Sequence, residues 1–138
     1  MKKFLSIILI LILASCANKV SSEDLVHLDG YWEIEKVKFP DGSTKEYTIN
    51  AMVDYFQVAD KTGYRKKVQP RLDGSYQTSD DAEKFTIHES NGEFLLHYKN
   101  NLSEWEEKIT LLTANQCVFV NQEQIAYHYK RFVPINLE

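Results

Sequence analysis

Short clusters of turn-forming residues recur along most of this 138-residue chain, and they limit its fold more than any other feature. From Tyr31 onward they come about every eight to twelve residues, and the runs between them are rich in Val, Ile, Thr, Tyr and Phe. The clusters occupy residues 40–43, 60–63, 73–74, 91–92, 100–101 and 121–123. This spacing predicts a single all-β domain, either an antiparallel sandwich or a barrel.

The Asn91-Gly92 pair predicts the pairing of two strands residue by residue, because Asn-Gly favours a two-residue type I′ turn. Ser90 then faces Glu93, and pairs further along the ladder follow by counting. The predicted pairs are Phe85 with Tyr98, Ile87 with Leu96, and Glu89 with Phe94.

A second two-residue turn at Asn100-Asn101 would extend this sheet, with Leu96 facing Trp105 and Phe94 facing Glu107. Because side chains alternate between faces, the two turns together predict one apolar face over three strands. Its members are Phe85, Ile87, Phe94, Leu96, Tyr98, Trp105, Ile109 and Leu111. Glu89 and Glu107 would then flank Phe94 at one end of that face.

The N-terminus has the anatomy of an export segment: two lysines followed by an apolar run over residues 4–13. That run is about half the ~20 residues that a membrane-spanning helix needs. Leu13-Ala14-Ser15-Cys16 resembles the bacterial lipobox, in which the cysteine is lipidated after cleavage. We therefore expect a lipoprotein signal peptide over residues 1–15 and a lipidated Cys16. The alternative is an ordinary secretory signal with a chance cysteine.

The expected organisation follows from this start. Residues 16–25 would be the lipidated cysteine and a small, polar, flexible tether, residues 26–132 the β-domain, and residues 133–138 a tail. Residue 17 is Ala where an inner-membrane retention signal would have Asp, so the outer membrane is the expected location.

Gly30-Tyr31-Trp32 opens the first predicted strand and resembles the Gly-x-Trp signature of lipocalins. Trp32 and Ile34 alternate in one phase, and Val37 and Phe39 alternate in the opposite phase. A β-bulge near residues 35–36 would bring both pairs inward. Arg131, or Lys130 beside it, lies on the last strand, where lipocalins place a basic side chain across the tryptophan ring. The resemblance covers about residues 26–132. It implies an antiparallel up-and-down barrel of about eight to ten strands, closed by pairing of the first and last strands.

The same resemblance implies a lipid-anchored monomer that binds a small apolar or amphipathic molecule inside the barrel. The expected ligand-binding residues are the inward set Phe85, Ile87, Glu89, Phe94, Leu96, Tyr98, Trp105 and Glu107. The two glutamates would mark an open, hydrated mouth that favours a cationic or neutral amphiphile over a fatty acid, unless the basic cluster near Arg65 also lines it. The alternative function is an envelope protein–protein interaction module, an inhibitor or assembly factor, with a filled barrel.

The remaining residues that could form a reactive or binding site have simpler structural explanations. Cys117 lies in an apolar strand and is expected to be an inert buried thiol. His88 and His97 would be diagonal neighbours on one hairpin face, but no further metal ligands follow at a recognised spacing. Arg65-Lys66-Lys67 with Arg71 is expected to be a solvated edge strand, with contact to an anionic ligand or lipid headgroup as the alternative.

The chain carries none of the motifs of phosphate-binding, hydrolase or metalloprotease sites, so we expect neither an enzyme nor a cofactor. Its formal charge of −4 becomes −6 once Lys2 and Lys3 are removed with the export segment. That acidity argues against nucleic acid as a partner.

Overall fold

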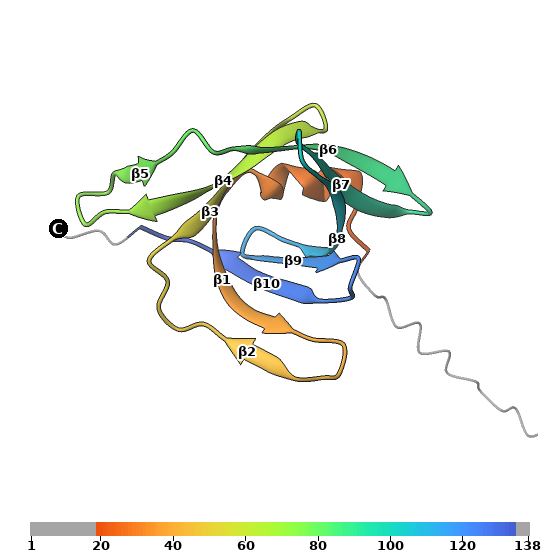
Figure 1. The fold of residues 1–138 in the computed structure, drawn as a ribbon, viewed down its shortest axis with the longest axis horizontal. Helices are drawn as coiled ribbons and strands as arrows, with labels where there is room; N and C mark the ends of the chain where they lie inside the picture. Colours follow the sequence, from red (N-terminus) through yellow and green to blue (C-terminus); the bar gives the residue numbers. More distant parts are fainter. Residues whose placement is uncertain (1–18, 135–138) are drawn as a thin grey trace, which may run out of the picture.

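The computed structural model describes residues 19–134, which form one antiparallel β-barrel preceded by a short 3-10 helix (Figure 1). Eight of its ten strands form the closed barrel, in the order β1, β3, β4, β6, β7, β8, β9, β10, and β10 pairs with β1 to close it. The predicted antiparallel barrel of eight to ten strands is therefore confirmed. The elements are η1 (Ser22–Leu28), β1 (Gly30–Lys38), β2 (Thr44–Glu46), β3 (Val53–Ala59), β4 (Thr62–Pro70), β5 (Tyr76–Thr78), β6 (Glu83–Ser90), β7 (Glu93–Lys99), β8 (Glu104–Leu112), β9 (Gln116–Asn121) and β10 (Ala126–Arg131).

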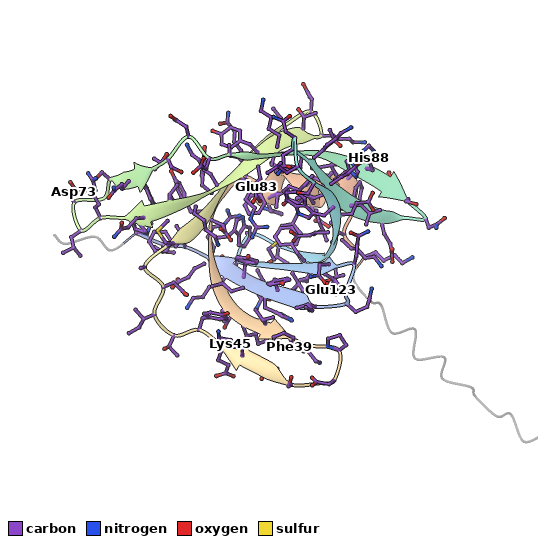
Figure 2. All side chains as sticks on the ribbon, in the orientation of Figure 1. Phe39, Lys45, Asp73, Glu83, His88 and Glu123 are labelled. Carbon is purple, nitrogen blue, oxygen red and sulfur yellow. The ribbon has the colours of Figure 1, made fainter. Side chains whose placement is uncertain are left out.

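The two remaining strands extend hairpins beyond the barrel wall. β2 pairs with the C-terminal part of β1, and β5 pairs with the C-terminal part of β4. Phe39 and Lys45 lie on the β1–β2 hairpin, away from the interior (Figure 2). Phe39 follows the end of β1 and is 37% exposed, so the prediction that it points inward with Val37 is wrong.

The predicted hairpin at Asn91-Gly92 is confirmed. Both turn residues have positive φ, 53° and 76°, as a type I′ turn requires. The pairs Phe85–Tyr98, Ile87–Leu96, Glu89–Phe94 and Ser90–Glu93 all occur.

The register predicted for the next strand is wrong by two residues. Asn100 does not form a two-residue turn. Its side-chain Oδ1 accepts hydrogen bonds from the backbone N–H groups of Leu102 and Ser103, which makes a longer loop before β8. Leu96 therefore pairs with Glu107, and Phe94 with Ile109. Because the shift is even, Trp105, Glu107 and Ile109 keep their predicted face.

Two bulges adjust which side chains point inward. The register of β1 against β10 shifts between Ile34 and Lys36, as predicted, and Val37 is buried opposite Tyr127. A second shift, between Ile109 and Leu111 on β8, was not predicted. It makes Leu112 the buried residue opposite Cys117, so the assignment of Leu111 to the inner face is wrong.

One end of the barrel is packed and covered by η1. This helix contacts both β3 and β8, which β4, β6 and β7 separate in the sheet, so it spans the opening. Leu28 is fully buried there and Leu25 packs against the core. Val20 is also buried, so the folded part begins before the boundary predicted at residue 26, and residues 20–25 are not a free tether.

The core that fills this half of the barrel consists largely of rings and branched aliphatic side chains, which Figure 2 shows between the strands. Its members include Trp32, Phe56, Phe85, Ile87, Phe94, Leu96, Tyr98, Ile109 and Phe119. No helical segment in residues 19–134 has the length and apolar character to cross a membrane.

Candidate functional site

The barrel end opposite η1 contains an open cavity of about 720 Å³. Two strands run from one end of the barrel to the other. β3 has Asp54 at the cavity and Val58 at the η1 end, and β6 has Glu83 at the cavity and Ile87 at the η1 end. The wall combines three aromatic rings with charged and polar side chains. The lining residues are Asp54, Arg65, Lys66, Lys67, Ser79, Asp81, Glu83, Trp105, Glu107, Asn121, Tyr127 and Tyr129.

Arg65 is the central charged group of this cavity. Its side chain is only 13% exposed, and its Nη2 donates hydrogen bonds to Asp54 Oδ2 at 2.9 Å and to the Tyr129 hydroxyl at 2.6 Å. Its Nη1 lies 3.4 Å from Glu107 Oε1. The guanidinium also lies over the rings of Phe56 and Phe119, at 5.1 and 5.8 Å from their centroids. Arg65 therefore joins β3, β8 and β10 through one buried charge.

Strand pairing brings this cluster together. β4 runs beside β3 with Arg65 opposite Phe56 and Lys67 opposite Asp54. Phe56 is fully buried, so its cross-strand partner Arg65 points inward as well. Because β4 lies between β3 and β6, the prediction of a solvated edge strand here is wrong. Arg71 is separate from this cluster and lies exposed in the β4–β5 turn.

Asp54 is the most buried carboxylate in the cavity wall, at 1% exposure. Burial alone would raise its pKa, but the charges of Arg65 and Lys67 outweigh this and lower the pKa of Asp54 below its usual value. Lys67 Nζ lies 2.6 Å from Asp54 Oδ1, although the geometry is not that of a directed hydrogen bond. Asp54 is thus an ionised group held between two cations.

Glu107 is in the opposite situation. Burial raises its pKa, and Arg65 only partly offsets this, since the same guanidinium is shared with Asp54. The two carboxylates thus differ in how well a cation compensates their charge.

We expect Glu107→Gln to stabilise the protein near neutral pH. A group whose folded pKa is raised stabilises the fold fully below its unfolded pKa of about 4.3, and this contribution is lost as pH rises through the folded value. The variant should therefore gain in free energy of unfolding over the native protein as pH increases from about 4 to 7. Urea denaturation across that range measures the difference. Glu89→Gln is the control, since this exposed side chain should give little difference at any pH, and a loss of stability in Glu107→Gln at neutral pH would contradict the prediction.

Of the predicted ligand-binding residues, only Trp105 and Glu107 line the cavity. The predicted roles of the other inward residues do not match their positions: Phe85, Ile87, Phe94, Leu96 and Tyr98 are buried in the packed half of the barrel. Glu89 is exposed, next to the β6–β7 turn at the η1 end, so it does not share a mouth with Glu107. The predicted register of β8 paired Phe94 with Glu107, which placed both glutamates in one row with Phe94. In the structure Glu107 pairs with Leu96, two residues further along β7.

Tyr98 has a feature that the sequence did not indicate. It is fully buried, and its hydroxyl has no hydrogen-bond partner among the described residues. Its ring stacks on Trp105 at 5.1 Å with an interplanar angle of 4°. Because Tyr98 pairs with Trp105 and Leu96 pairs with Glu107, Tyr98 and Glu107 are diagonal neighbours on one face.

The predicted contact between the first and last strands is present at the η1 end. The Arg131 guanidinium lies 3.8 Å from the centroid of the Trp32 ring and donates hydrogen bonds to the carbonyl groups of His27, Asp29 and Ala114. Gly30 makes room for it: a Cβ there would lie 2.7 Å from Arg131 Nη1, and its φ of 118° is strained for other residues. Lys130 is exposed and pairs with Glu33, so of the two candidates it is Arg131 that lies on the ring.

The remaining candidates lie away from the cavity. His88 and His97 are neighbours, with ring centroids 5.8 Å apart, and His97 Nδ1 lies 3.1 Å from Glu106. Across residues 19–134, no three His, Cys, Asp or Glu side chains form a group that could hold a metal ion. Cys117 is fully buried, and burial raises the pKa of its thiol strongly, as for an inert core cysteine. Cys16 lies outside the described residues.

Comparisons with known proteins give two similar folds. No protein-family model and no curated protein sequence matches the chain. A lipocalin-like protein from Bacteroides uniformis is 11% identical, with a TM-score of 0.48 over 77% of this chain and 99% of that chain. An uncharacterized protein from Bacteroides eggerthii is 13% identical, with a TM-score of 0.48 over 76% of this chain and 99% of that chain.

Proposed function

We propose that this protein is a lipid-anchored envelope protein that binds a small amphipathic molecule in the open half of its barrel. The observation that carries the proposal is the cavity beside Arg65. Its volume of about 720 Å³ lies within the ~300–1,000 Å³ typical of small-molecule sites.

The wall of the cavity suits an amphipathic ligand better than a purely apolar one. Trp105, Tyr127 and Tyr129 offer ring faces for an apolar body, while Arg65 and Glu107 place charge in the same space. Lys66 and Lys67 also line the cavity. The sequence favoured a cationic or neutral ligand only if this basic cluster did not line the mouth, so that preference no longer applies.

Trp105→Ala is expected to weaken binding of a fluorescent amphiphile such as 1-aminoanthracene by roughly tenfold or more, since an aromatic contact and its buried area are lost. Tyr64→Ala is the matched control, because Tyr64 packs against Tyr55 outside this cavity. Fluorescence titration of the purified proteins measures both affinities. Equal affinities for the native protein and Trp105→Ala would contradict binding in the cavity.

The lipid anchor is supported by the lipobox-like Leu13-Ala14-Ser15-Cys16. Lys19 and Val20 lie beside Gly92 and Phe94, at the η1 end. Only three residues separate Cys16 from Val20, and an extended chain spans about 3.3–3.6 Å per residue. An anchor on Cys16 would thus hold the η1 end near the membrane and turn the cavity away from it.

Cys16→Ser is expected to abolish lipidation, because the thiol is the acyl acceptor. The variant should accumulate as an unprocessed precursor or as a soluble exported form. Metabolic labelling with a fatty acid and fractionation of the envelope test this. If the variant is cleaved at the same site and still partitions with membranes, the protein is not anchored through Cys16.

A second candidate is an envelope protein–protein interaction module, an inhibitor or assembly factor. It is favoured by the filled η1 half of the barrel and by exposed apolar side chains such as Ile49 and Leu72, which are 92% and 71% exposed. Native mass spectrometry of protein purified from its own envelope separates the two. A small-molecule adduct supports the binder, and a stoichiometric protein partner with no adduct supports the module.

A further inference from the structure

We propose that the ligand carries a sugar-like head, an uncharged ring with adjacent hydroxyl groups, which binds on the cavity wall formed by Trp105, Glu107 and Asn121. This inference rests on the proposed function, because it names the chemical class of the molecule that the cavity takes. It is carried by a hydrogen-bond donor and an acceptor that strand pairing places side by side, next to an aromatic ring.

Glu107 and Asn121 are direct cross-strand neighbours on β8 and β9, and both line the cavity. Side chains paired in this way have Cβ atoms about 4.5–5.5 Å apart on one face of the sheet. Both residues are partly exposed, so a molecule in the cavity can reach them. A single ligand head can therefore contact both side chains.

Asn121 offers the donor. Its Oδ1 accepts hydrogen bonds at 3.0 Å from the backbone N–H groups of Glu123 and Ile125, and these two bonds define the orientation of the amide. Within residues 19–134, the Nδ2 atom of Asn121 makes no hydrogen bond. The β9–β10 turn thus holds the side chain in place while its N–H groups remain available to a ligand.

Glu107 offers the matching acceptor. Its Oε1 lies 3.4 Å from Arg65 Nη1, and its Oε2 has no hydrogen-bond partner in the part of the chain that the structure describes. A hydroxyl group both donates and accepts. One hydroxyl of an adjacent pair can therefore donate to Glu107 Oε2 while its neighbour accepts from Asn121 Nδ2, and neither bond needs a charge on the ligand.

Two aromatic rings adjoin this pair and also line the cavity. Trp105 lies two residues before Glu107 on the same face of β8, and its stacking on Tyr98 fixes the orientation of the indole. Tyr127 is the diagonal neighbour of Asn121 across β9 and β10. A sugar ring has C–H bonds on its faces and hydroxyl groups around its rim, and C–H bonds pack well on the electron-rich face of an aromatic ring. The wall therefore suits both the faces and the rim of a sugar ring.

A charged head is disfavoured because charges of both signs line the same space. Arg65 and Lys67 lie 2.9 and 2.6 Å from the carboxylate of Asp54, and Arg65 also faces Glu107. An ammonium head beside Glu107 would approach Arg65, and an anionic head beside Arg65 would approach both carboxylates, so like charges repel in either case. An uncharged hydroxyl head avoids both costs and still forms charge-assisted hydrogen bonds, which are the stronger kind.

The test compares ligands that share an octyl chain and differ in their heads, by calorimetric titration of the purified protein below the concentrations at which they form micelles. The sugar ligands are the octyl pyranosides of glucose, galactose and mannose. The comparison ligands are octylamine, octanoate and tetraethylene glycol mono-octyl ether, whose head is uncharged but has no ring of hydroxyl groups. At least one glycoside is expected to bind roughly tenfold or more tightly than every comparison ligand.

Two variants test the contacts. Asn121→Asp keeps the Oδ1 that accepts the turn hydrogen bonds but removes the N–H donor, and Glu107→Met removes the acceptor while keeping a side chain of similar length. Each should remove most of the advantage of the glycoside over the ether, with little change in the affinity for the ether. Asn101→Asp and Glu89→Met are the matched controls at exposed positions outside the cavity, and both should bind all ligands as the native protein does.

The outcomes separate this inference from the proposed function. If no glycoside binds more tightly than every comparison ligand, the sugar-like head is excluded while the cavity remains a binding site for amphiphiles. A glycoside preference that survives in both variants would overturn the contact with Glu107 and Asn121. If none of the ligands binds, the sugar-like head and small-amphiphile binding are both overturned. The circular dichroism spectrum of each variant shows that the barrel is intact.

Discussion

Arg65→Met is expected to lower the free energy of unfolding by about 3–5 kcal/mol, because it leaves buried carboxylates without their shared cation. Asp54 is 1% exposed and Glu107 is 13% exposed, so water cannot replace the guanidinium at little cost. The Tyr129 hydroxyl would also lose its donor. Chemical denaturation at neutral pH measures the change.

The pH dependence of this variant makes the prediction more specific. With Arg65 removed, burial dominates the pKa of both carboxyl groups, and each becomes neutral more readily on acidification. The stability deficit of Arg65→Met should therefore be largest near neutral pH and should shrink as pH falls. Lys67→Met is the matched control, since it removes a cation from the same Asp54 but from a side chain that is 60% exposed. We expect less than about 1 kcal/mol for it. Similar losses in both variants would contradict a special role for the buried cation.

Trp32→Ala is expected to cost about 3–5 kcal/mol, because it removes a fully buried ring from the packed end of the barrel. It also removes the hydrogen bond that Trp32 Nε1 donates to the Leu28 carbonyl, which ties β1 to η1. Such a loss is a large share of the stability of a small domain. Thermal or urea unfolding measures it.

The Arg131 contact is tested in the same series. Arg131→Ala should cost roughly 0.5–2 kcal/mol if its attraction to the indole ring contributes. Arg71→Ala, at an exposed arginine in the β4–β5 turn, should cost little. In a double-mutant cycle, Trp32→Ala and Arg131→Ala should be non-additive, and strict additivity would show that the 3.8 Å contact contributes no coupling energy.

Local chemistry explains the features that the sequence predicted correctly. Asn91-Gly92 defines a register because both residues tolerate positive φ and a two-residue turn permits only one pairing. The broken alternation between Trp32 and Val37 predicts a bulge because period-2 geometry allows no other way to bury both. The prediction of a two-residue turn at Asn100 was wrong because the Asn100 side chain accepts hydrogen bonds from the backbone of Leu102 and Ser103. These bonds stabilise a loop longer than the two residues that the Asn-Asn pair predicts.

The sequence by itself determined the all-β class and the hairpin from β6 to β7, because these depend on a local period and on a turn. The closed barrel and the contact of Trp32 with Arg131 or Lys130 were expected only from the resemblance to lipocalins. The cavity and its charges were decided only by tertiary structure. Arg65 meets Glu107 across 42 positions of the chain and Tyr129 across 64, and no local period records which distant charge a strand will face. A run of three basic residues has the same pattern whether it faces water or the barrel interior. Only barrel closure, which brings β3, β4, β8 and β10 around one space, turned Arg65 into a buried cation that faces Asp54, Glu107 and Tyr129.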